Sequence, residues 1–343
     1  MKKLLNTLFV TTPDTYLALD GENVVVKKEG EILKRYPLHN LEAICSFGYT
    51  GVSPALMGAC AERQIALTFL TSHGRFLARV IGEDRGNVLL RREQYRIADD
   101  EKRSVGIARN IICGKIYNSK WILERATRDY PLRLDVNRIK RITASLSETL
   151  QSVRHVEALD GLRGMEGTAA TQYFSVLDDL ILQQKEHFVF HGRSRRPPLD
   201  NVNALLSFAY TLLAHEVLGA LETVGLDAYV GFLHRDRPGR ASLALDMMEE
   251  LRSVYADRLV LSLINKKMVS ASGFYPKENG AVLMDADTRK HVLKVWHEKK
   301  QDTIWHPYLQ EKIPWGLVPY AQALLLARYI RGDLDEYPPF MWK

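Results

Sequence analysis

Hydrophobic and polar residues alternate over the first ~85 positions, which is the pattern of half-buried β-strands. Residues 16–19 and 24–26 are two such runs, and Asp20 and Gly21 lie between them as a hairpin signal. Residues 53–64 instead have helical spacing, with Ser53 as a cap and a proline at the first helical position. The pattern predicts a small sheet with one short helix.

From about residue 87 the period changes to that of helices and stays so to the end of the chain. Residues 105–128 fit an amphipathic helix with a basic side, and residues 201–228 fit a long, mostly apolar helix. We therefore predict an α+β protein. A small N-terminal β-rich domain (1–86) is followed by a linker (87–98) and a larger, mostly α-helical domain (99–343).

Composition narrows the class of protein. A hydrophobic fraction of 46% with 26% charged residues is ordinary for a folded soluble domain, and no run approaches the ~20 uninterrupted apolar residues of a membrane span. Cys45, Cys60 and Cys113 are widely spaced and form no metal-type pair, which favours a reducing cytoplasm. The N-terminus does not have the pattern of a signal peptide. The net charge of +6 favours an anionic partner without proving one.

Side chains that could bind a metal or take part in catalysis are concentrated in residues 222–257. His234 lies in a turn rich in arginine, and a helix that begins at Ser242 follows it. At 100° per residue, one face of that helix would carry polar residues, which are Asp246, Glu249, Glu250, Ser253 and Asp257. Carboxylates suit Mg²⁺ or Mn²⁺, and an imidazole among them is acceptable to Mn²⁺. A solvated acidic face is the alternative interpretation.

Two earlier segments add to this picture. Glu166 lies between two glycines at the start of a predicted helix that continues to Gln184, where a carboxylate would also suit the helix dipole. Arg193, Arg195 and Arg196 then form a proline-containing basic loop, and guanidinium groups match phosphate oxygens. A solvated loop is an equal alternative.

The combination of four segments resembles a known family. GMEG around Glu166, RRPPLDNVNALLSFAY, GLDAYVGFLH ending at His234, and SLALDMMEELR are similar to the CRISPR-associated integrase and endonuclease of spacer acquisition, the first-numbered CRISPR-associated protein. The motifs cover about residues 160–260, and the layout of domains covers the whole chain. The ending, residues 335–343, resembles members from type I-C systems.

The resemblance implies a metal site that consists of a glutamate, a histidine and a further acidic residue. Glu166 and His234 match the first two positions, and Glu249 is our choice for the third. Asp246 is either a further metal ligand or a residue that supports a ligand. Glu250 lies on the same face of the predicted helix, so which carboxylate binds the metal stays open. The implied cofactor is Mg²⁺ or Mn²⁺.

The implied reaction joins the 3′-hydroxyl ends of short DNA duplexes, the new spacers, into the CRISPR repeat array. The implied partners are double-stranded DNA (spacer precursor and repeat), a second copy of the chain bound through the β domain, and a small second CRISPR-associated protein. No membrane is involved. The candidate DNA contacts are Arg193, Arg195, Arg196, Arg235, Arg237, Arg240 and Tyr173, although an aromatic residue at the position of Tyr173 is more often part of the core.

Two alternatives stay open. The chain would be a non-catalytic DNA-binding scaffold if the acidic helix only packed against arginines. Its apolar, proline-containing ending, residues 337–342, would either dock in a groove of a partner or fold onto its own chain.

Overall fold

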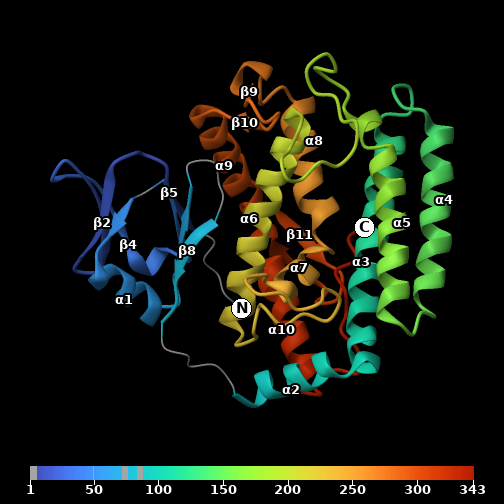
Figure 1. Ribbon diagram of the computed structural model, residues 1–343, viewed down its shortest axis with the longest axis horizontal. Coiled ribbons are helices and arrows are strands. Elements are labelled where there is room, and N and C mark those ends of the chain that lie inside the picture. The colour runs from blue at the N-terminus through green and yellow to red at the C-terminus, as the bar shows by residue number, and fades with distance from the viewer. Residues whose placement is uncertain (1–5, 49, 72–75, 83–87) are drawn as a thin grey trace. The chain divides into compact units, whose positions relative to one another are not determined.

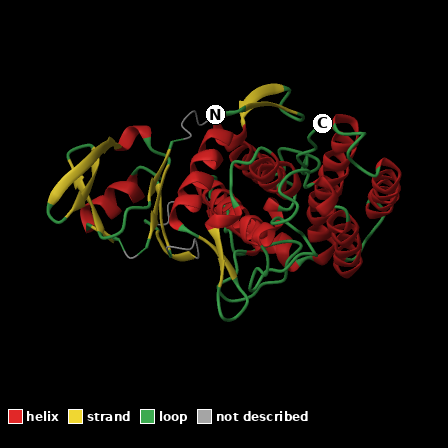
Figure 2. Cartoon of the chain, turned by 90° about the horizontal axis from the view of Figure 1, so that it is seen from above, coloured by secondary structure: helices red, strands yellow, loops and turns green. Residues whose placement is uncertain are grey.

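The computed structural model describes residues 6–48, 50–71, 76–82 and 88–343, which belong to two compact units (Figure 1). Unit 1 comprises residues 1–85, 284–302 and 314–317, and unit 2 comprises the remaining residues. Strands dominate the first unit and helices the second (Figure 2). The α+β class expected from the sequence is therefore confirmed. The boundary expected at residues 86 and 87 lies outside the described residues.

Unit 1 contains two four-stranded sheets and a short helix. The first sheet has the order β1-β5-β7-β8, with strands Thr7–Val10, Ala43–Phe47, Ala66–Leu70 and Phe76–Val80. The second has the order β4-β3-β2-β6, with strands Glu31–Pro37, Asn23–Lys28, Thr15–Asp20 and Gly51–Val52. The expected hairpin is β2–β3, in which Ala18 pairs with Val25 and Gly21 adopts a φ of +57°. Helix α1 (Pro54–Glu62) begins at the Ser53 cap, whose hydroxyl accepts from the Leu56 amide at 3.2 Å.

One helix from late in the chain belongs to unit 1. Helix α9 (Ala286–Gln301) lies against strand β1, where the rings of His297 and Phe9 are 6.4 Å apart and the Lys300 ammonium lies 3.3 Å from the Thr7 hydroxyl. The sequence pattern predicts residues 99–343 as one helical domain, whereas α9 belongs to unit 1. Helical periodicity shows that a helix forms but not which core it joins.

Unit 2 is built from helices. They are α2 (Val88–Asp99), α3 (Glu101–Asp129), α4 (Val136–Val153), α5 (Leu159–Ser175), α6 (Asn201–Thr223), α7 (Ser242–Met248), α8 (Arg258–Asn265) and α10 (Val318–Ile330). Short strand pairs accompany them: β9 (Phe274–Pro276) with β10 (Val282–Met284), and β11 (Thr303–His306) with β12 (Glu311–Pro314). Helices α3, α4 and α5 run side by side (Figures 1 and 2). The segment expected as a linker, residues 87–98, is almost entirely helix α2.

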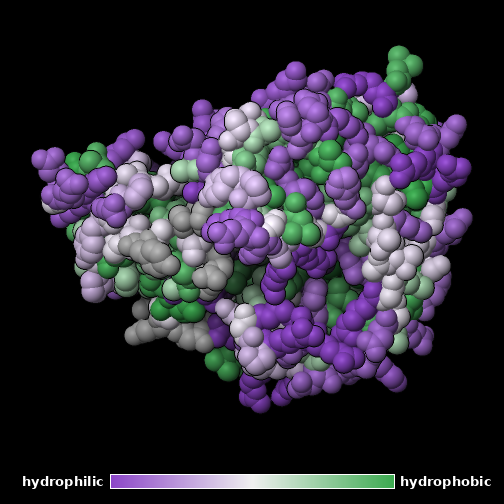
Figure 3. Space-filling model, turned by 45° about the horizontal axis from the view of Figure 1, so that its top comes forward, coloured by the Kyte–Doolittle hydropathy of each residue, from purple (hydrophilic) through white to green (hydrophobic). Residues whose placement is uncertain are grey.

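Helix α6 is long and apolar enough, by length and composition, to cross a membrane. It instead packs against α7, α8, α10 and the π-helical segment Arg252–Asp257 inside unit 2. Most of its leucines and alanines are buried there, so its composition is explained by a position in the protein core. On the face shown in Figure 3, hydrophilic residues dominate and hydrophobic ones gather around a hollow.

Two helix predictions near the candidate chemistry are wrong in detail. Glu166 lies in the middle of α5 rather than at its start, and α5 ends at Ser175 rather than Gln184. The helix expected from Ser242 onward is interrupted after Met248 and continues as the π-helical segment and then α8. The alternative interpretation, a solvated acidic face, is wrong, because the five polar residues assigned to that face are all buried.

The C-terminal ending folds onto unit 2. Tyr337 and Phe340 are buried, and the Glu250 carboxylate accepts hydrogen bonds from the Tyr337 hydroxyl at 2.5 Å and from the Phe340 amide. Asn118 of α3 accepts from the Trp342 amide at 2.8 Å. The alternative expected from the sequence, a tail packed on its own chain, is therefore confirmed, and docking of this ending on a partner stays a hypothesis.

Candidate active site

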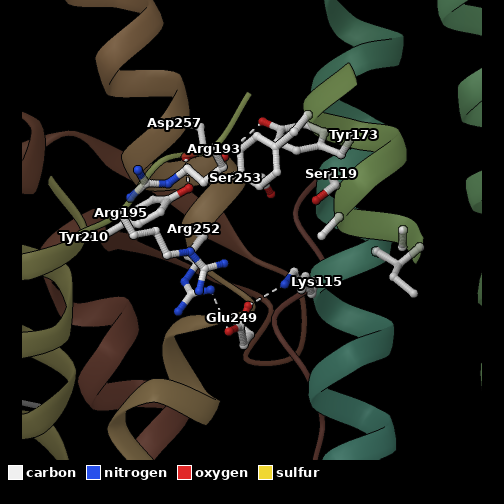
Figure 4. Close-up of a pocket in the computed structure, with 14 residues that line it drawn as sticks. Lys115, Ser119, Tyr173, Arg193, Arg195, Tyr210, Glu249, Arg252, Ser253 and Asp257 are labelled. Carbon is white, nitrogen blue, oxygen red and sulfur yellow. Dashed lines mark hydrogen bonds and ion pairs between the residues drawn. The ribbon is translucent and has the colours of Figure 1, made fainter. Parts of the chain in front are cut away.

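Helices α3 and α5 and the segment after α7 bring four charged side chains together. The Lys115 ammonium lies 2.7 Å from Glu249 Oε2 and also contacts Glu166 Oε1. Arg252, three residues after Glu249, binds the other oxygen of that carboxylate at 2.7 Å. Figure 4 shows Glu249 between Lys115 and Arg252. Two carboxylates thus converge on one cation, with a second cation behind them.

The Glu249 carboxylate is 3% exposed, and burial alone would favour its protonated form. Arg252 and then Lys115 outweigh that effect, with a smaller contribution from His234, and the pKa of Glu249 falls from 4.5 to about 2. Glu249 is therefore a buried anion at neutral pH.

His234 is held by Asp246, which is completely buried. Asp246 Oδ1 accepts from the His234 ring Nδ1 at 2.5 Å and from its backbone amide at 3.0 Å. Oδ2 accepts from the amides of Phe232 and Leu233 at 2.7 and 2.9 Å. A Cβ at Gly231 would lie 2.7 Å from Oδ2, so this close approach needs glycine. Because Nδ1 binds the carboxylate, Nε2 is the imidazole nitrogen that can bind a metal or a proton donor.

Arg163 connects the His234 loop to α5. Its guanidinium donates from Nε and Nη2 to the Leu233 carbonyl at 2.9 and 2.7 Å. Arg163 lies one turn before Glu166 on the same helix, so the loop before His234 is fixed relative to Glu166. Glu166 and His234 are far apart in sequence, but the Arg163 contact connects the segments in which they lie.

The donor set is suited to a divalent metal. Glu166 and Glu249 supply oxygens that already point at one cation, and His234 supplies a nitrogen whose opposite side is bound by a carboxylate, as in many metal sites. Among the residues that the structure describes, no three His, Cys, Asp or Glu side chains stand ready to hold an ion together. Lys115 occupies the position between the two carboxylates. Asp246 has both oxygens engaged by residues 232–234, which favours the interpretation that it supports His234.

A small cavity of about 30 Å³ adjoins Lys115 and Glu249. Tyr210 on its wall has the guanidinium groups of Arg193 and Arg252 over its ring, at 5.1 and 5.3 Å (Figure 4). The Tyr210 and Tyr173 hydroxyls both donate to Asp257, at 2.6 and 3.0 Å. These contacts form a polar cluster next to the charged residues described above.

Asp257 predicts a dependence of stability on pH. Burial raises its pKa from 3.8 to about 6, against the two tyrosine hydrogen bonds, which lower it. Between these values the folded protein keeps a proton that the unfolded chain releases, so stability falls as pH rises from about 4 to about 6. In the Asp257→Asn protein, the decrease in the free energy of unfolding over this pH range should be smaller by about 3 kcal/mol. Urea denaturation of the wild type and of Asp257→Asn at pH 4 and pH 7 measures this difference. If the stability of the two proteins changed equally with pH, the prediction would be contradicted.

The structure divides the candidate DNA contacts into two groups. Arg195, Arg196, Arg235 and Arg237 are exposed, although Arg235 lies 3.3 Å from Asp160. Arg193 instead binds Asn203 and Ser207, and Arg240 binds the Arg235 carbonyl and Ser242. Tyr173 is a core residue through its bond to Asp257.

Several residues of this site have roles that no sequence pattern predicts. The sequence predicts Lys115 only as one position of the basic-sided helix within residues 105–128, and no motif marks Arg252, Tyr210 or Arg163. Arg252 could have been found from its position three residues after Glu249, where helical side chains meet. Lys115 and Arg163 depend on contacts between helices that are distant in sequence.

The chain is similar to known proteins of one family. A family model described as CRISPR associated protein Cas1 matches residues 8–298. The chain is 50% identical over 343 residues, the full length of both proteins, to CRISPR-associated endonuclease Cas1 1 of Chlorobaculum tepidum. It is 50% identical over 347 residues, again at full length, to CRISPR-associated endonuclease Cas1 2 of Rhodospirillum rubrum.

Solved structures share the fold. A Cas1 protein from Thermotoga maritima has a TM-score of 0.81 and 20% identity, covering 95% of this chain and 97% of its own. A casposase bound to an integration product has a TM-score of 0.83 and 22% identity, covering 98% of this chain and 94% of its own.

Proposed function

The chain belongs to the CRISPR-associated Cas1 family of endonucleases and integrases, and on this premise we propose that it is a metal-dependent enzyme that joins DNA ends. The substrate is a short DNA duplex with 3′-hydroxyl ends, and the target is the CRISPR repeat. The observation that carries the proposal is the convergence of Glu166 and Glu249 on one cation, together with the Arg163 contact that ties the loop before His234 to the helix of Glu166.

Glu166, Glu249 and His234 Nε2 would hold an Mg²⁺ or Mn²⁺ ion. The ion, when bound, would polarise the target phosphate and stabilise charge on the attacking and leaving oxygens. Asp246 keeps the His234 ring in place and keeps its proton on Nδ1. Arg252 remains at Glu249 Oε1 and holds that carboxylate in its ionised form. Water in place of the 3′-hydroxyl would give cleavage instead of joining.

The exposed arginines fit contacts with the DNA backbone. Arg195, Arg196, Arg235 and Arg237 leave their guanidinium groups at the surface, where they can bind phosphates in pairs of hydrogen bonds. Arg193 and Arg240 stabilise the two loops in which these exposed arginines lie. If several of these cations contact phosphate, DNA affinity should fall steeply with salt.

The proposed assembly follows from relatives as well as from the family. Structural neighbours include a Cas6-RT-Cas1–Cas2 complex, in which a Cas1 chain is assembled with Cas2. We propose that this chain acts in the cytoplasm as a homodimer, formed through its β domain, together with such a partner. Membership in a type I-C system is part of the same proposal.

A strand-joining assay tests the function. The purified protein and its partner are incubated with a labelled duplex and a repeat-containing plasmid, in Mg²⁺, Mn²⁺ or EDTA. We expect joined product with either ion and none in EDTA, because the carboxylates alone cannot activate a phosphodiester. A matched duplex with 3′-deoxy ends should bind equally well but give no joined product. Binding without product under every ion would favour the non-catalytic DNA scaffold.

A further inference from the structure

Lys115 lies where a metal ion would bind. Its side chain extends from α3, is 13% exposed, and contacts Glu166 Oε1 and Glu249 Oε2. These are the two carboxylates to which the proposed function assigns the ion. Within the described part of the chain, no other partner is recorded for the ammonium group. One positive charge therefore forms ion pairs with both carboxylates.

Lys115 and a divalent ion cannot share this position. Cations held a few ångströms apart between the same carboxylates repel strongly in a poorly solvated site. Arg252 can stay, because it is on the far oxygen of Glu249 and lies over the Tyr210 ring. Lysine, in contrast, is a point charge on a flexible stem and can swing away.

The adjoining cavity can receive the displaced ammonium. Lys115 already lines it, and its volume of about 30 Å³ is sufficient for a water-sized group. The hydroxyl of Ser253, also on its wall, is buried and has no hydrogen-bond partner among the described residues. The same cavity is also lined by Asp257, whose carboxylate accepts from Tyr173 and Tyr210, and by Arg193, Arg195 and Arg252. Figure 4 shows Lys115, Ser253 and Asp257 around this space.

We propose that Lys115 is an internal counter-ion that exchanges with the divalent metal. In the metal-free protein its ammonium holds Glu166 and Glu249 together. When the ion binds, the side chain moves into the cavity toward Ser253. This exchange rests on the proposed metal site, and it makes the lysine a competitor that lowers metal affinity while keeping the empty site folded.

Metal binding without DNA tests the exchange directly. Isothermal titration with Mn²⁺ is carried out on the wild type, Lys115→Met and Lys115→Arg. Lys115→Met removes the competing charge and should tighten Mn²⁺ binding about tenfold or more, whereas Lys115→Arg should not tighten it. Lys102→Met, on an exposed position of the same helix, is the control and should match the wild type.

Thermal unfolding provides a second measurement. In EDTA, Lys115→Met should melt below the wild type, because Glu166 and the buried Glu249 lose their shared cation. Saturating Mn²⁺ should raise its melting temperature by more than it raises that of the wild type. If Lys115→Met proves poorly folded without metal, purification in Mn²⁺ followed by competition with a chelator gives the same affinity.

The outcomes separate this inference from the proposed function. Unchanged or weaker Mn²⁺ binding by Lys115→Met would overturn the exchange, provided that Glu166→Gln and Glu249→Gln lose Mn²⁺. If those two glutamine variants bind Mn²⁺ as the wild type does, the metal site itself is wrong.

Discussion

A Glu166→Gln protein is expected to bind DNA as the wild type does but to join and cleave strands roughly a thousandfold more slowly, equivalent to about 4 kcal/mol of transition-state stabilisation. Glutamine keeps the shape of the side chain but removes the charge that would bind the ion. The side chain of Glu166 is 27% exposed and lies in the middle of a long helix, so the fold should not depend on it. Loss of activity would then report on chemistry rather than on stability.

Single-turnover joining in Mn²⁺, together with a DNA-binding titration, measures this effect. His234→Ala and Glu249→Gln should show the same loss, although Glu249→Gln also leaves Lys115 and Arg252 without their shared carboxylate and should be less stable. Glu157→Gln, an exposed position just before α5, is the matched control. Joining by Glu166→Gln within tenfold of the wild-type rate would show that Glu166 is not a ligand.

Truncation after Glu336 should lower the melting temperature of unit 2 by at least ~10 °C. It removes the buried rings of Tyr337 and Phe340, each worth about 3–5 kcal/mol. It also removes two donors to Glu250, a buried carboxylate whose pKa burial raises to about 8. Because Glu250 is next to Glu249, the loss should also reduce Mn²⁺ affinity.

Calorimetry of the truncated chain and of two point variants separates these contributions. Tyr337→Phe removes only the hydroxyl donor and should cost about 1–3 kcal/mol, whereas Phe340→Ala creates a cavity and should cost about 3–5 kcal/mol. Removal of Lys343 alone should change little, since its exposed ammonium only lies over the Trp121 ring. A truncated chain with wild-type stability and a failure to assemble with its partner would instead support a docking role for the tail.

Local signals in the sequence determined most of the secondary structure. The Asp20-Gly21 turn set the β2–β3 hairpin, and the Ser53 cap set the start of α1, because both depend on neighbouring residues only. The long helices α3 and α6 followed from the spacing of their apolar residues. The residue types in the site, including Glu166, His234 and Glu249, could also be identified from their motifs.

Tertiary structure decided how those residues act. Asp246 and Glu249 are three apart on a helix and look alike in sequence, yet one binds the His234 loop and the other binds Lys115 and Arg252. The break after Met248 separates them, and backbone amides from residues 232–234 occupy Asp246. A periodic pattern cannot show which buried acceptor meets which donor, since that depends on contacts between distant segments.

The sequence by itself therefore determined the fold class, the family and the kinds of side chain at the site. Only the folded chain decided the assignment of α9 to unit 1, the packing of the tail on Glu250, and the position of Lys115 between two carboxylates. The physical reason is the same in each case. Propensity and periodicity act over a few residues, whereas burial and charge pairing join groups that meet only after the chain has folded.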